Sequence, residues 1–241
     1  MAQPSTHSTQ KLYREMLNFC RHVAGSCQIT ATCICGDFAL GFSESKASAE
    51  VLLIVRDFQP RLMTYVKMID GRNVIFSAVD QWVFERDVER GFLGEALASR
   101  LIFPYTVLEN EDYLRAQEVR LKKRLICDLL ESLVLNFPEL SYELRIKPEY
   151  FMYEVLLSRA KLFPPMIYSL DNFMRPDFFK ENANRVLSGY QEALRDLEKG
   201  KLVDTQEGYV RISREFIHSV RSRKARFVSL FKTAQRGQRA L

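Results

Sequence analysis

The sequence lacks any apolar run long enough to cross a membrane as a helix. Its longest apolar run, near residues 51–55, has the length of a strand, whereas a membrane span needs about 20 apolar residues. Residues 1–7 lack the basic and apolar regions of a secretory signal. The five cysteines are an odd number without disulfide-type spacing, which is typical of a reducing compartment. These absences predict a cytoplasmic protein without a transmembrane segment.

Acidic residues are absent after Glu215, and this makes the net charge of +5 uneven along the chain. Seven basic residues lie within 221–241, whereas the remaining 28 basic residues face 30 acidic ones. The seven are Arg221, Arg223, Lys224, Arg226, Lys232, Arg236 and Arg239. A local basic patch can bind polyanions, so these side chains are candidates for binding nucleic acid or another anion.

The composition is otherwise that of an ordinary globular protein, with 47% hydrophobic and 27% charged residues. A length of 241 residues suits one large domain or two modest ones. The sequence contains no internal repeat and no low-complexity tract.

The most informative segment is Gly36-Asp37-Phe38-Ala39-Leu40-Gly41, which follows a predicted strand over 29–35. A polar loop over 43–48 comes next, and an apolar strand over 51–56 follows it. This order and spacing resemble the signature of the nucleotidyltransferase superfamily, in which a strand ends in Gly-Ser, a short helical turn ends in Gly, and a second strand opens with Asp-x-Asp. The resemblance implies the superfamily's mixed sheet and a ligand-binding turn at Gly36, Asp37 and Gly41.

The chemistry of the superfamily is altered at its key positions. Asp37 stands where the phosphate-binding serine belongs, and an ionised carboxylate repels a triphosphate. Ala49 and Val51 stand where the two metal-binding aspartates belong, and two-metal catalysis needs those carboxylates. No cofactor is therefore expected and no metal site is predicted. If the protein is active, Asp37 and Asp80 are the candidate catalytic ligands of magnesium, with Glu44 or Glu50 as further candidates.

Periodicity and turn signals divide the rest of the chain into elements. The N-terminal part predicts a helix over 9–24, a helical turn over 38–42, a hairpin over 62–69 and 73–79 around Asp70-Gly71, and helices over 81–90 and 91–100. Further on, helices are predicted over 111–137, 148–163 and 177–199, a hairpin over 202–212 with its turn at Glu207-Gly208, and a last helix capped by Ser213.

These elements predict an α+β fold with two domains. Residues 1–110 form a nucleotidyltransferase-like α/β domain whose mixed sheet has flanking helices. Residues 111–241 form a mainly helical domain with the hairpin near 202–212 and a basic terminal helix. That helix could bind nucleic-acid phosphates, lie on an anionic membrane, or simply pack with its charges solvated. The absence of a stop signal after Gly237 also suggests a longer chain or a partner that completes the helix.

The sequence as a whole predicts a catalytically degenerate nucleotidyltransferase-fold protein that acts as a nucleotide- or nucleic-acid-binding or regulatory module. Two alternatives stay open. One is an active metal-dependent nucleotidyltransferase with relocated carboxylates. The other is a ligand-free interaction domain of a larger protein, with a protein partner or a further domain at the C-terminal helix.

Overall fold

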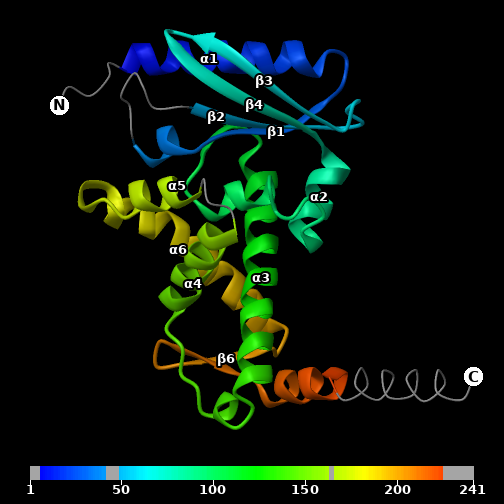
Figure 1. Cartoon of the computed structure of the whole chain (residues 1–241), viewed down its shortest axis with the longest axis vertical. Helices are drawn as coiled ribbons and strands as arrows, with labels where there is room; N and C mark the ends of the chain where they lie inside the picture. Colours follow the sequence, from blue (N-terminus) through cyan, green and yellow to red (C-terminus); the bar gives the residue numbers. More distant parts are fainter. Residues whose placement is uncertain (1–5, 42–48, 163–165, 225–241) are drawn as a thin grey trace, which may run out of the picture. The chain divides into compact units, whose positions relative to one another are not determined.

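The computed structural model describes residues 6–41, 49–162 and 166–224 (Figure 1). The elements follow in the order α1 (Thr6–Ala24), β1 (Ile29–Cys35), η1 (Asp37–Leu40), β2 (Ala49–Val55), β3 (Leu62–Ile69), β4 (Arg72–Asp80), α2 (Gln81–Arg90), η2 (Ala98–Ile102), β5 (Thr106–Glu109), α3 (Glu111–Asn136), η3 (Leu140–Tyr142), α4 (Pro148–Leu162), α5 (Met166–Phe173), α6 (Pro176–Lys199), β6 (Val203–Gln206) and β7 (Tyr209–Ile212). A further helical segment covers residues 214–224.

The chain divides into two compact units that alternate along the sequence. The first unit contains residues 1–122 and 154–189, and the second contains residues 123–153 and 190–241. The chain passes from one unit to the other within α3, α4 and α6. The predicted domain boundary at residue 110 coincides with the start of α3, inside the first unit.

The first unit is built on a five-stranded mixed sheet with the strand order β3-β4-β2-β1-β5. Strands β2 and β4 are parallel, and the other neighbouring pairs are antiparallel. Together with the flanking helices and the separate β6–β7 hairpin, this confirms the predicted α+β fold class. The Asp70-Gly71 turn is also confirmed, because both residues have the positive φ values, 50° and 74°, that a tight hairpin requires.

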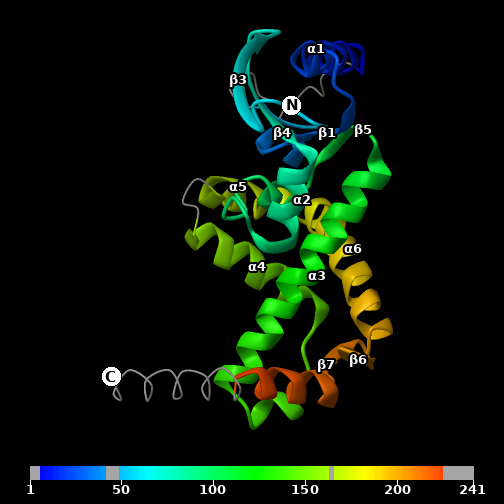
Figure 2. The same cartoon turned by 90° about the vertical axis from the view of Figure 1, so that its right-hand side faces the viewer.

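One face of the sheet is covered by α1, as Figure 2 shows. The apolar stripe of this helix packs against the alternate residues of β2 and β4 that point toward it. Its fully buried members include Met16 and Cys20. The helix ends where the sequence predicts, at Gly25, whose φ of 60° suits a glycine after a helix.

The prediction of a helix over 91–100 is wrong for most of that segment. It forms turns, and a short 3₁₀ helix begins only at Ala98. The reason is the carboxylate of Asp87, which is buried at the end of α2 and accepts backbone N–H bonds at 2.7–3.2 Å. The donors are Leu93, Glu95, Leu97 and Ala98. The chain therefore wraps around one acceptor, which a continuing helix could not do.

The second unit has its own core around the β6–β7 hairpin. The hairpin turns at Glu207 and Gly208, which have φ values of 53° and 78°, as the sequence predicts. An isolated bridge joins Ile146 to Val210 of β7. Ser213 begins the last helix by accepting the backbone N–H of Phe216 through its hydroxyl at 3.1 Å.

Candidate functional site

The Gly36 turn has the geometry expected from its glycines. Gly36 has a φ of 73° and ends β1, and Gly41 has a φ of 101° at the end of η1. A Cβ atom on Gly41 would lie 3.1 Å from the ring of Phe178, which belongs to α6. Asp37 is half-buried and opens η1. The turn is thus a packed element as well as a bend in the chain.

The two positions at which the sequence resemblance expects metal-binding aspartates are buried in the core. Ala49 and Val51 are fully buried in the cluster that packs against α1. Glu50, which lies between them, points to the opposite face, as the strand period predicts. It stands beside Gly36, since a Cβ atom there would lie 3.5 Å from Glu50 Cγ.

The carboxylate of Glu50 forms an ion pair with the guanidinium of Arg100 from η2. Both side chains are largely buried, with 32% and 22% of their surfaces exposed. The one acidic side chain that β2 offers next to the turn therefore already has a cationic partner.

Asp80 lies far from this turn. The parallel register pairs it with Val55, whereas Ala49 pairs with Val74, so about 20 Å of strand separates the two ends. Asp80 caps α2 by accepting the N–H groups of Trp82 and Val83, and it also accepts from Phe58 and Arg61. The structure does not bring Asp37 and Asp80 together, and Glu44 lies outside the described residues.

A magnesium ion does not fit the residues at the Gly36 turn. Magnesium needs several oxygen ligands in octahedral geometry. The turn offers Glu50, which is paired with Arg100, and Asp37, while the neighbouring positions on β2 are apolar. Among the described residues, no group of three or more His, Cys, Asp or Glu side chains could hold a metal ion.

The carbonyl groups of η1 are held by α6 instead of facing solvent. Asn182 donates to the carbonyl of Leu40 at 3.1 Å. Arg185 donates to the carbonyl of Ala39 at 3.2 Å and to that of Tyr105 at 2.6 Å. Residues that are more than 140 positions away in sequence therefore fix the shape of the turn.

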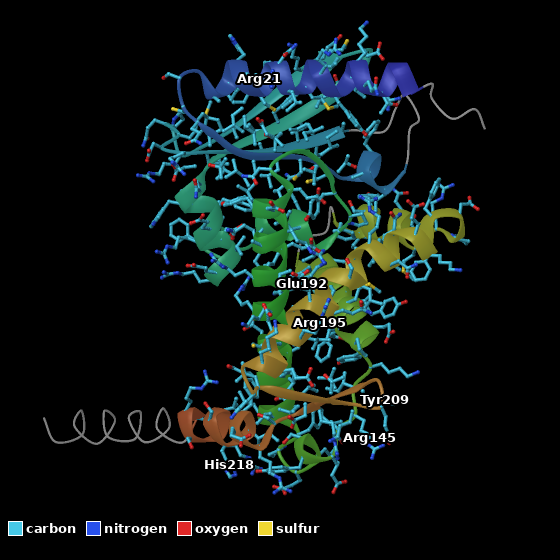
Figure 3. The ribbon with its side chains drawn as sticks, turned by 180° about the vertical axis from the view of Figure 1, so that it is seen from behind. Arg21, Arg145, Glu192, Arg195, Tyr209 and His218 are labelled. Atoms are coloured by element: carbon cyan, nitrogen blue, oxygen red, sulfur yellow. The ribbon has the colours of Figure 1, made fainter. Side chains whose placement is uncertain are left out.

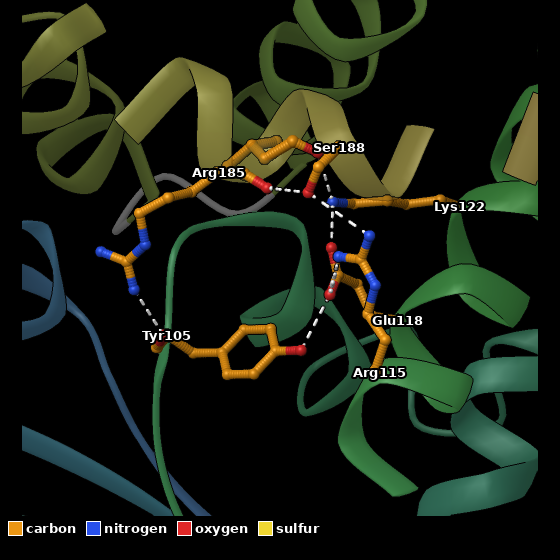
Figure 4. Close-up of polar contacts among 7 residues, drawn as sticks. Tyr105, Arg115, Glu118, Lys122, Arg185 and Ser188 are labelled. Atoms are coloured by element: carbon orange, nitrogen blue, oxygen red, sulfur yellow. Dashed lines mark hydrogen bonds and ion pairs between the residues drawn. The ribbon is translucent and has the colours of Figure 1, made fainter. Parts of the chain in front are cut away.

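Next to Arg185 lies a cavity of about 440 Å³ between the β5 edge and helices α3 and α6 of the first unit. Figure 4 shows its polar wall. Glu118 accepts from Tyr105 Oη at 2.8 Å, from Arg115 at 3.0 Å and from Lys122 at 2.5 Å. Arg115 also donates to the hydroxyl of Ser188 at 3.3 Å. The polar groups of this wall thus satisfy one another.

The Glu118–Lys122 pair is nearly inaccessible to water, with 4% and 1% of the side chains exposed. Burial lowers the pKa of Lys122, and the adjacent Glu118 carboxylate opposes that effect. Burial, followed by the charge of Glu118, raises the pKa of Tyr105 far above its usual range. Lys122 also donates to the carbonyl of Val186 at 2.8 Å, so the pair ties α3 to α6.

The basic C-terminal residues are described only as far as Lys224. Arg221 donates to Glu139 at 3.3 Å and to Tyr142 Oη at 3.3 Å, and Arg223 donates to Glu131 at 2.7 Å. Figure 3 shows this helix of the second unit with His218 on it. The candidates Arg226, Lys232, Arg236 and Arg239 lie outside the described residues. Within residues 6–41, 49–162 and 166–224, no helix is both long and apolar enough to span a membrane.

Sequence reasoning missed the partners that decide the chemistry of the turn. Arg100 ends the segment 91–100 that was predicted as a helix, and Arg185 lies on a helix that was predicted from its apolar stripe. Neither position carries a local motif. Only the folded chain brings the guanidinium of Arg100 to Glu50 and that of Arg185 to the carbonyls of Ala39 and Tyr105.

Comparison with known proteins yields only distant likenesses, all among solved structures. No protein-family model and no curated protein matches the chain. Among solved structures, a nucleotidyltransferase-like protein from Exiguobacterium sibiricum matches with a TM-score of 0.36 and 13% sequence identity, over 78% of this chain and 75% of that one. A likeness at this level carries no information about activity, so the function is inferred from the residues of this chain.

Proposed function

We propose that this chain is a catalytically inactive, cytoplasmic protein with a nucleotidyltransferase-type sheet that works as a nucleotide- or nucleic-acid-binding module. The observation that carries the proposal is the Glu50–Arg100 ion pair beside Gly36. Nucleotidyl transfer needs carboxylates that hold two divalent ions at this place. Here Ala49 and Val51 are buried, and Glu50, the remaining carboxylate of β2 at the turn, is neutralised by Arg100.

A nucleotidyl-transfer assay tests the inactive part of the proposal. The protein is incubated with each labelled nucleoside triphosphate, magnesium or manganese, and an RNA or DNA acceptor. We expect no transfer product from the natural chain or from Arg100→Ala, because β2 then still supplies only one carboxylate and its neighbours Ala49 and Val51 supply none. A metal-dependent product that Glu50→Gln abolishes would show an active enzyme with relocated ligands.

The binding part is tested separately by thermal unfolding with ATP, CTP, GTP or UTP, and by anisotropy of labelled RNA and DNA. Ligands that bind only the folded state raise the unfolding temperature as their concentration increases. Stabilisation by a nucleotide, or saturable binding of an oligonucleotide, supports the module. If no nucleotide and no nucleic acid binds, the alternative of a ligand-free interaction domain replaces it.

A further inference from the structure

A second cleft lies at the opposite end of β2 and β4 from the Gly36 turn. It has a volume of about 660 Å³ and is lined by Arg56, Asp57, Arg61, Asp80, Gln81, Trp82 and Glu85, all from the first unit. The two parallel strands end here, because Val55 and Asp80 are register partners. Ligands of α/β sheets often bind at the carboxyl ends of parallel strands, so the position itself suits a binding site.

An exposed aromatic pair marks this cleft. Trp82 is the only tryptophan of the chain and is 50% exposed, and Phe92 beside it is 55% exposed. Their ring centroids lie 5.9 Å apart with an interplanar angle of 70°. Neither residue is part of the buried core, so packing does not explain why two large rings stand together in solvent.

Guanidinium groups surround the tryptophan ring. Arg61 and Arg86 each place Cζ 5.6 Å from the ring centre, which is within cation–π range. Arg56 lies on the cleft wall, is exposed, and belongs to no ion pair within the described part of the chain. The cleft lining therefore combines an aromatic ring with two arginines, of which Arg61 is paired with Asp80 and Arg56 is not paired among the described residues.

The carboxylates of the cleft are mostly turned toward the protein. Asp80 is buried and accepts bonds from Arg61 and from three backbone N–H groups. Glu85 accepts from Gln81 Nε2 at 2.9 Å and from Tyr113 Oη at 3.2 Å. Asp57 is the exposed acidic residue of the lining, and Glu89, just outside it, pairs with Arg86 and Arg120.

We propose that this cleft binds single-stranded nucleic acid, with a base stacked on Trp82 and an adjoining phosphate at Arg56. Aromatic platforms bordered by cations are the common means of holding unpaired bases without reading their sequence. The inference rests on the proposed function for the class of ligand and adds the place where it binds.

Intrinsic fluorescence tests the site directly, because Trp82 is the only tryptophan. The full chain is titrated with unstructured DNA and RNA oligonucleotides of about 12 nucleotides, a length within the usual range for such sites. We expect saturable quenching of the emission and an affinity that falls as salt rises. Deoxythymidine monophosphate should not quench at the same concentrations.

Variants separate stacking from charge, with affinity measured by anisotropy of a labelled oligonucleotide. Trp82→Ala should weaken binding about tenfold, whereas Trp82→Phe should retain most of the affinity. Arg56→Ala should weaken binding and reduce the salt dependence by roughly 0.7 in the logarithmic slope. Tyr168→Ala on α5, where the side chain is 75% exposed, and Arg21→Ala on α1 (Figure 3) are matched controls that should change nothing.

Each contrary outcome has a distinct meaning. Oligonucleotide binding that leaves the fluorescence and the Trp82→Ala affinity unchanged would place the ligand elsewhere, which overturns this inference and leaves the proposed function standing. Equal quenching by the mononucleotide would overturn the assignment to single strands. Binding of nucleoside triphosphates without any oligonucleotide binding would likewise overturn the assignment to single strands. If neither nucleotides nor oligonucleotides bind, the proposed function is overturned as well. Circular dichroism melting shows that each variant is folded.

Discussion

At the scale of single residues, the clearest constraint is the small size of Gly189. This residue lies in α6 against the buried Glu118–Lys122 pair. A Cβ atom there would overlap the Glu118 carboxylate and would lie 2.7 Å from Lys122 Nζ. Since buried charges lose much of their stability when their pairing is disturbed, the close approach of α6 depends on the missing side chain.

We expect Gly189→Ala to reduce the free energy of unfolding by at least about 2 kcal/mol in urea denaturation. In an ordinary helix interior, replacing glycine by alanine raises the stability by about 1 kcal/mol. A loss of stability would therefore show that the contact with the ion pair outweighs helix propensity. Asn184→Ala, at an exposed position of α6, is the control and should be neutral or slightly stabilising. A stabilised Gly189→Ala protein would show that the ion pair moves aside easily.

Glu50 shows which part of the candidate site can be predicted from the sequence and which part cannot. The strand period correctly predicts that Glu50 points away from Ala49 and Val51, because it depends only on local geometry. The Arg100 partner could not be predicted, since it comes from a segment whose path is fixed by Asp87 and not by its own periodicity. Whether Glu50 is free or neutralised is therefore settled only in the folded chain.

At the scale of elements, the sequence predicts a helix, strand or turn correctly where that element has its own apolar periodicity or turn residues. Strand β1 has the predicted bounds 29–35, and both hairpins have their predicted turns. Strand β5 was missed because four residues show no alternation, and α5 was missed because it directly follows two prolines. Both elements are defined by their neighbours: β5, for example, exists through its pairing with β1.

The loop after α2 depends on one hydrogen-bond acceptor, the carboxylate of Asp87, and this dependence can be tested. We expect Asp87→Asn to lower the free energy of unfolding by about 2–3 kcal/mol. The carboxylate accepts the four N–H bonds through two oxygens, whereas an amide has only one oxygen that can accept. The amides of Leu93, Glu95, Leu97 and Ala98 should lose hydrogen-exchange protection first. Asp196→Asn on α6, whose side chain is 42% exposed, should have little effect. Unchanged protection at the four amides would contradict the assigned role of Asp87.

At the scale of the whole molecule, several buried weak acids make the folded state sensitive to alkali. Burial raises the pKa of Cys20 from 9.0 to about 12 and that of Cys127 to about 11. Burial also raises the pKa values of Tyr105 and Tyr113, with a further contribution from a neighbouring glutamate in each case. The folded protein therefore keeps protons that the unfolded chain loses first, near pH 9–10.

Stability contributed by these groups is complete below about pH 9 and is lost as the pH rises toward their folded pKa values. Lys122 and Cys35 act in the opposite direction, since their pKa values are lowered. We expect the free energy of unfolding to fall by about 2 kcal/mol between pH 8 and pH 10.5. Cys20→Ala should show a smaller loss over this interval. A stability that is constant up to pH 10.5 would contradict the burial of these groups.

The alternation of the two units along the chain has a consequence for biosynthesis. Every strand of the five-stranded sheet has been translated once residue 109 is made, yet Asn182 and Arg185, which hold the Gly36 turn, come much later. A ribosome needs about 4 to 15 seconds to cover that interval. During it the nascent chain carries the strands of the sheet without the two side chains that hold the Gly36 turn. The segment over 123–153, which belongs to the second unit, is translated in the middle of this interval, so the second unit begins before the first is complete.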